Sequence, residues 1–199
     1  MPRKSAKRDS AADVPLNQAS ASEKSSSDHK RSPIAELSVK LGVQRIVSGG
    51  QTGVDRGALD AAIALGMQHG GWCPRGRLAE DGPIPLRYLL RETEAPEYAV
   101  RTEQNVLDSD GTLVLYKGRL QRGTLLTYRL AQKHSRPVMR VRLDLPIDVV
   151  TIQQWIVDQR IRILNVAGPR ASSSPGIDAE ATELLQRVFT QPLPGLLFD

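Results

Sequence analysis

Short apolar segments alternate with longer amphipathic segments between residues 45 and 189. The apolar segments are rich in β-branched residues and predict buried strands at 45–48, 71–73, 112–116, 138–143 and 161–167. Between them, apolar residues recur at helical spacing and predict helices over 55–65, 96–107, 123–134, 151–160 and 178–189. A further short helix is expected over 33–42.

Apolar strands that alternate with helices are typical of a parallel sheet covered on both faces. We therefore predict an α/β fold: a Rossmann-like, doubly wound, mainly parallel sheet of about five strands with helices on both faces. In such sheets, ligands bind at the carboxyl ends of the strands, near the point where the strand order reverses. This rule directs attention to the loops 48–56, 73–87, 117–124 and 168–177.

Composition narrows the class of protein. The 199 residues are 40% hydrophobic and 25% charged, which is ordinary for a soluble globular protein. No stretch approaches the roughly 20 apolar residues that span a bilayer, and no apolar secretory signal opens the chain. One cysteine allows no internal disulfide and no zinc-binding cysteine cluster. We expect a cytoplasmic protein without a membrane partner.

The positive charge is concentrated at the start of the chain. The net charge is +5, but residues 1–40 hold eight basic and five acidic residues, which leaves 19 basic against 17 acidic in the rest. A nearly neutral globular part is not a nucleic-acid footprint, so nucleic acid is not an expected partner. Residues 1–32 include few apolar residues, and the acidic residues of this segment argue against a transit peptide. We predict a disordered, basic, Ser-rich tail over 1–40, with a basic docking arm as the alternative, and a single Rossmann-like ligand-binding domain over 41–199.

The loop after the first strand has the composition of an anion site. Its glycines let the backbone turn sharply and approach a ligand closely, and the amides that begin the next helix favour negative charge. The sequence matches neither a Walker A loop nor the dinucleotide pattern GxGxxG. A tight turn with Asp55 as the helix N-cap is the alternative. The candidate residues for a phosphorylated ligand are Gly49, Gly50, Gln51, Thr52, Gly53, Asp55 and Arg56.

The other loops supply further candidates. Arg75 and Arg77 could clamp a phosphate or carboxylate, while Glu80 and Asp81 could contact sugar hydroxyls or ring nitrogens. A solvated loop is the alternative for this segment. In the later loops, Gly123 permits close approach, Thr124 can cap a helix or bind an anion, and Gly168 and Arg170 suit a polar ligand.

Groups for conventional catalysis are scarce. No histidine accompanies a serine or cysteine in triad-like order, and Asp108 and Asp110 lack partners for a metal. Cys73 either faces the site or is a small buried apolar residue. Arg101, Asn105 and Asp108 share one helix face, which is either part of the site or solvated. We therefore predict no catalytic residue and no metal.

Five motifs, taken together, resemble the molybdenum cofactor carrier family within the SLOG group of Rossmann-like ligand-binding domains. They are IVSGGQTGVDRGA at 46–58, GGWCP at 70–74, AEDGPIP at 79–85, DSDGTL at 108–113 and NVAGPR at 165–170. The match runs in order from residue 43 to about residue 190 and leaves the tail outside. The resemblance implies a carrier that holds molybdopterin, with its phosphate at the turn 49–53. It also implies a homo-oligomer, and molybdoenzymes that receive the cofactor.

The sequence departs from its relatives in the fourth loop. Many such proteins have paired glycines before the threonine, whereas here Arg122 precedes Gly123 and Thr124. Cytokinin-activating phosphoribohydrolases of similar fold carry a catalytic glutamate three residues after the threonine, where this chain has Thr127. Because that chemistry needs a carboxylate, we favour a carrier. The alternatives are a phosphoribohydrolase-like hydrolase that uses Glu80 or Asp81 as its acid or base, and a nucleotide-sensing SLOG domain.

Overall fold

The computed structural model describes residues 41–194, so the predicted tail and nearly all of the helix expected over 33–42 lie outside the described residues. The described part contains a central sheet of five parallel strands. In spatial order these are β2 (Gln68–Gly70), β1 (Arg45–Val47), β9 (Ile163–Ala167), β7 (Gly111–Tyr116) and β8 (Val138–Arg142). The predicted α/β class and parallel sheet are confirmed.

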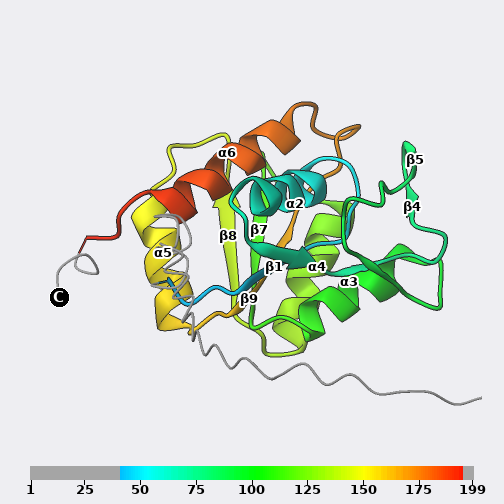
Figure 1. Cartoon of the computed structure of the whole chain (residues 1–199), viewed down its shortest axis with the longest axis horizontal. Helices are drawn as coiled ribbons and strands as arrows, with labels where there is room; N and C mark the ends of the chain where they lie inside the picture. Colours follow the sequence, from blue (N-terminus) through cyan, green and yellow to red (C-terminus); the bar gives the residue numbers. More distant parts are fainter. Residues whose placement is uncertain (1–40, 195–199) are drawn as a thin grey trace, which may run out of the picture. The chain divides into compact units, whose positions relative to one another are not determined.

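Helices cover both faces of this sheet (Figure 1). One group consists of α2 (Val54–Ala64), α5 (Val149–Asp158) and α6 (Ile177–Thr190), in which α6 packs against both α2 and α5. The other group consists of α3 (Tyr98–Leu107) and α4 (Arg122–Lys133). The chain winds in opposite directions from β1 to β2 and from β7 to β8, and right-handed crossovers therefore place the connecting helices on opposite faces. The doubly wound arrangement is confirmed.

The core lies where the central strands meet α2 and α6. Ile46, Leu113 and Leu164 come from three adjacent strands and are fully buried. Helix α2 approaches α6 closely at Gly57, which has no side chain. A Cβ there would overlap the backbone oxygen of Asp178. This contact also brings the loop before α6 next to the turn before α2.

The strand predicted at 71–73 is present over Trp72–Cys73, but it is wrong as a strand of the central sheet. The second strand of that sheet is β2 at Gln68–Gly70, and its edge position leaves Gln68 exposed, so that no apolar pattern marks it. Gly71 has φ +122° and lies against Ser48, where a side chain would not fit. After this bend, β3 (Trp72–Cys73) pairs with β6 (Arg91–Glu92) in a separate two-stranded sheet.

The loop predicted over 73–87 contains a small antiparallel hairpin, β4 (Leu78–Ala79) and β5 (Gly82–Pro83). The other predicted strands and helices are present, with ends shifted by a few residues. Across residues 41–194, every helix is too short or too polar to cross a membrane.

Candidate functional site

A cavity of about 710 Å³ opens at the carboxyl ends of β1, β9 and β7. Its wall consists of the loops after these strands together with the first turns of α3 and α4. The strand order reverses between β1 and β7, so the cavity lies at the position that the topology rule predicts. Its volume falls within the roughly 300–1,000 Å³ typical of small-molecule sites.

The charges that line the cavity are mostly positive. Five basic side chains stand against a single acidic one, Asp55; the basic residues are Arg101, Lys117, Arg119, Arg122 and Arg170. Lys117 is paired with Glu180 at 2.6 Å, Arg101 with Asp55 at 2.9 Å and Arg170 with Glu80 at 3.6 Å. Arg119 and Arg122 therefore supply the positive excess of the wall. An excess of positive charge in a concave wall attracts anions.

The structure divides the candidates from the sequence into two groups. Those that line the cavity are Gln51, Asp55, Gly123, Thr124, Gly168 and Arg170. The others lie outside its wall: Gly49, Gly50, Thr52, Gly53, Arg56, Arg75, Arg77, Glu80 and Asp81. In most of this second group, protein atoms occupy the contacts that a ligand would need.

The glycines of the first turn make room for protein atoms. Gly53, with φ +78°, packs against the backbone of 169–171, and the Val54 amide donates to the Pro169 oxygen at 3.2 Å. Gly50 faces Leu90 and Ile84. Gly53 therefore lets the loop after β9, which lines the cavity, pack against the first turn, whereas Gly50 packs against a small apolar cluster away from the wall.

The guanidinium of Arg101 is held by contacts with Gly49 and Asp55. A Cβ on Gly49 would overlap the Arg101 Nη1 atom, so the guanidinium lies directly against this glycine. The Asp55 carboxylate accepts from Arg101 Nη1 and, at 3.3 Å, from the Gln51 amide. The N-cap of α2 is Gly53, so the alternative reading of Asp55 as the N-cap is wrong.

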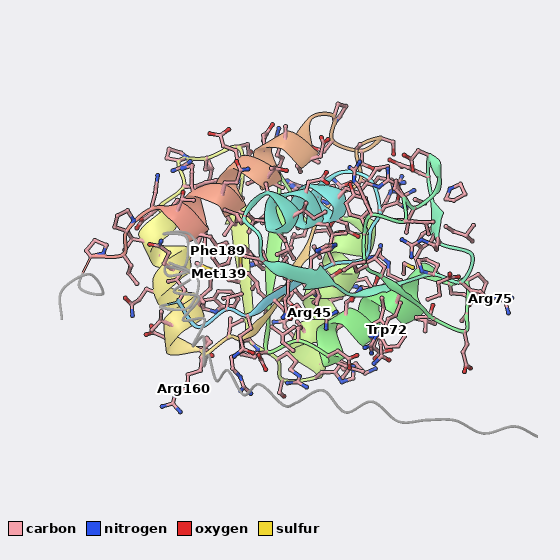
Figure 2. All side chains as sticks on the ribbon, viewed as in Figure 1. Arg45, Trp72, Arg75, Met139, Arg160 and Phe189 are labelled. Carbon is pink, nitrogen blue, oxygen red and sulfur yellow. The ribbon has the colours of Figure 1, made fainter. Side chains whose placement is uncertain are left out.

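The two arginines of the second loop have different positions. Arg77 donates to the backbone oxygens of Ile84, Pro85, Tyr88 and Leu90 and thereby holds the loop in shape. Arg75 is exposed, and its side chain extends outward near the β4–β5 hairpin (Figure 2). Neither arginine is directed at the cavity wall.

The carboxylates at the tip of the hairpin bind other parts of the protein. Glu80 accepts hydrogen bonds from the Ser172 hydroxyl, the Thr52 hydroxyl and the Ser172 amide. Burial alone would raise the pKa of Glu80, but these bonds, with Arg170 nearby, hold it below its usual value.

Asp81 accepts from both terminal nitrogens of Arg56, at 2.6 and 2.7 Å. These hydrogen bonds lower the pKa of Asp81 despite its partial burial. A general acid at neutral pH needs a raised pKa, so neither Glu80 nor Asp81 has the environment for that role.

The polar face of α3 is packed against β3. Asn105, only 3% exposed, accepts from the Trp72 amide at 2.8 Å and donates to the Trp72 oxygen at 2.9 Å. The Trp72 indole donates to Asp108 at 2.7 Å. These bonds fix α3 against the small sheet, and Arg101, one turn earlier, thereby reaches Asp55. The reading of this face as simply solvated is wrong.

Comparison with known proteins agrees with this architecture. The sequence model of the circularly permutated YpsA SLOG family matches residues 46–189. The chain belongs to this SLOG family. A crystal structure from Syntrophus aciditrophicus, named "putative molybdenum carrier protein", is similar to this SLOG domain at 45% identity and a TM-score of 0.70. The match covers 74% of this chain and 95% of that chain. No curated protein matches.

The structure shows the environments of two further residues of the SLOG domain, Cys73 and Thr127. Cys73 is fully buried beside Leu59, Ile84 and Tyr88, where burial raises the pKa of its thiol, so it acts as a small apolar residue. Thr127 lines the cavity and donates to the Gly123 oxygen at 3.0 Å.

Within residues 41–194, no three acidic, histidine or cysteine side chains gather as a metal site would require.

Sequence reasoning had not singled out Lys117 or Arg119. Both follow the most apolar strand of the sheet, β7, and line the cavity. Their position directly after a strand near the switch point was the signal that could have identified them.

Proposed function

We propose that this SLOG protein is a carrier that binds a phosphorylated, pterin-like ligand in the 710 Å³ cavity, with the molybdenum cofactor as its best candidate. The observation that carries the proposal is the cavity wall, whose five basic side chains include two, Arg119 and Arg122, that pair with no carboxylate among residues 41–194. The name of the similar Syntrophus aciditrophicus protein supports the choice of ligand.

The first turn of α4 is the part of the wall best suited to a phosphate. The N-cap residue Gln121 makes no side-chain capping bond, so the first amides of the helix are not occupied by it. No heavy atom lies within 4 Å of a Cβ built on Gly123, which leaves open space there. The buried Thr124 and the exposed Arg122 add a hydroxyl and a positive charge. Such helix starts favour anions.

This proposal moves the phosphate from the turn 49–53, where the sequence placed it, to the start of α4. The turn still contributes to the site through Gln51 and Asp55, which line the cavity. Arg170 reaches the cavity from the loop after β9 and can contact the rest of the ligand. The dianionic charge of a phosphate monoester would offset the positive charge of Arg119 and Arg122.

A carrier fits this wall better than the hydrolase alternative. The one carboxylate that lines the cavity, Asp55, is paired with Arg101, and Thr127 stands where related phosphoribohydrolases have glutamate. The carboxylates suggested for acid or base catalysis, Glu80 and Asp81, have lowered pKa values and lie outside the cavity wall. Transfer to a molybdoenzyme and assembly into a homo-oligomer remain parts of the proposal.

The test is to purify the full chain from cells that make the cofactor and to record native mass spectra. After oxidation, the released compound should show pterin fluorescence at close to one equivalent per chain. Arg122→Gln should lower the pterin content, because it removes a charge at the proposed phosphate site. The matched control is Arg160→Gln, since Arg160 precedes β9 and lies at the opposite ends of the strands from the cavity. A copurified nucleotide that the protein converts to product would overturn the proposal.

A further inference from the structure

Arg101 has an unusual set of partners for an arginine in a cavity wall. Its side chain is 13% exposed, and its Nη1 donates to the Asp55 carboxylate, which is 5% exposed. Its Nε is buried and has no hydrogen-bond partner within residues 41–194. A buried donor without a partner is costly, and such groups in folded proteins call for an explanation.

The shape of the guanidinium shows what could satisfy this donor. A guanidinium is planar, and its Nε–H and one Nη2–H point in the same direction along one edge. Two oxygens of one phosphate or carboxylate match that edge with two parallel hydrogen bonds. In Arg101 the Nη1 side is used by Asp55, which leaves the Nε–Nη2 edge for another acceptor.

The surroundings hold the guanidinium in one place. Gly49 leaves the space that the Arg101 head group occupies, since a Cβ there would overlap Nη1 and would lie 2.8 Å from the Asp55 carboxylate. Asp55 in turn is held by the Gln51 amide. Residues from α2, α3 and the loop between β1 and α2 therefore fix a single arginine beside an anion-attracting cavity.

We propose that Arg101 is a ligand-binding residue that receives a two-oxygen anion through its Nε–Nη2 edge, with Asp55 and Gly49 as positioning residues. The inference rests on the proposed function only in placing an anionic ligand in this cavity. It makes the site selective for an oxyanion that offers two acceptor oxygens on one side. A halide ion offers a single acceptor and would bind less well.

The first experiment measures inorganic phosphate binding to the full chain by isothermal titration, with chloride holding the ionic strength constant. Arg101→Lys keeps the charge but removes the two-donor edge, so the phosphate affinity should fall about tenfold or more. Gly49→Ala keeps the arginine but displaces its head group, and it should weaken phosphate binding in the same direction. Arg160→Lys, outside the site, should change the affinity less than about twofold.

The second experiment locates the anion. Crystals soaked in selenate, a tetrahedral anion with an anomalous signal, should show a peak within hydrogen-bond distance of Arg101 Nε and Nη2. The inference is overturned if selenate binds only elsewhere, or if folded Arg101→Lys and Gly49→Ala both keep the wild-type phosphate affinity. Failure of the carrier proposal looks different: phosphate binding would depend on Arg101, yet no pterin would copurify. If pterin copurified and both variants retained it, the carrier proposal would stand and this inference would fail.

Discussion

The contact between Asn105 and Trp72 gives a sharp test of how the site is supported. We predict that Asn105→Leu, which roughly conserves volume, destabilises the fold by about 2–4 kcal/mol. The variant removes two hydrogen bonds, of 2.8 and 2.9 Å, to the backbone of Trp72. Each bond contributes about 1 kcal/mol net, and its unpaired backbone partner adds a desolvation cost.

The assay is urea unfolding followed by far-UV circular dichroism, with thermal unfolding as a second measurement. For a domain of this size, the expected loss corresponds to a fall in melting temperature of about 5–15 °C. The matched control is Gln104→Leu on the same helix. Its side-chain amide bonds Asp108 at 3.0 Å near the surface, so the control should stay within about 0.5 kcal/mol of wild type.

Asn105→Leu should also weaken phosphate binding, because Arg101 precedes Asn105 by one helical turn and depends on the same packing of α3 for its position. A stability within about 1 kcal/mol of wild type, at an unchanged urea dependence, would refute the reasoning. It would mean that the packing of α3 against β3, and not these two bonds, holds Arg101 in place.

Three other predictions concern the turn, the hairpin and the cysteine. Gly53→Ala should lower the free energy of unfolding by more than about 2 kcal/mol, because the new Cβ overlaps the Pro169 oxygen and the backbone at this positive φ is strained. The control Gly66→Ala is also at positive φ but has nothing within 4 Å of the new Cβ, so its loss should be about 1 kcal/mol; urea unfolding measures both. Because the pKa of Glu80 is lowered in the native state, the stability it contributes is present above the unfolded pKa of about 4.3 and is lost as pH falls through the native pKa. The stability difference between wild type and Glu80→Gln should therefore be about 1 kcal/mol at pH 7 and close to zero near pH 2; an equal difference at both pH values would contradict the role of ionised Glu80. Cys73, fully buried with a raised pKa, should resist iodoacetamide in the native protein and react in urea, as mass spectrometry would show; rapid native labelling would contradict its burial.

The sheet could be predicted because its central strands are continuous apolar runs. Leu113, Val114 and Leu115 are all fully buried, and such runs carry a strong signal. The polar edge strand at Gln68–Gly70 carries none, since it needs only one strand neighbour and little burial. The position of the cavity followed from topology alone.

The residues of the site were harder to predict, because a charged side chain can bind either a ligand or another part of the chain. Arg56 and Asp81 are 25 positions apart and bind each other, while Glu80 finds Ser172 across 92 positions. Nothing local distinguishes these residues from Arg170, which does line the cavity. The choice between ligand and protein partner is made only when distant loops come together.

The place of β9 in the sheet has a consequence for how the protein is made. Among residues 41–194 it is the last strand to leave the ribosome, yet it pairs with both β1 and β7. Until it is synthesised, the strand pairs β2–β1 and β7–β8 cannot join into one sheet, and the edges of β1 and β7 that β9 covers lack a partner strand. Parallel pairing across such long loops is slow, and open edges invite association with other chains. A chain that stops before residue 163 should therefore aggregate and not persist as a partly functional protein. Chaperone binding during synthesis would limit this aggregation.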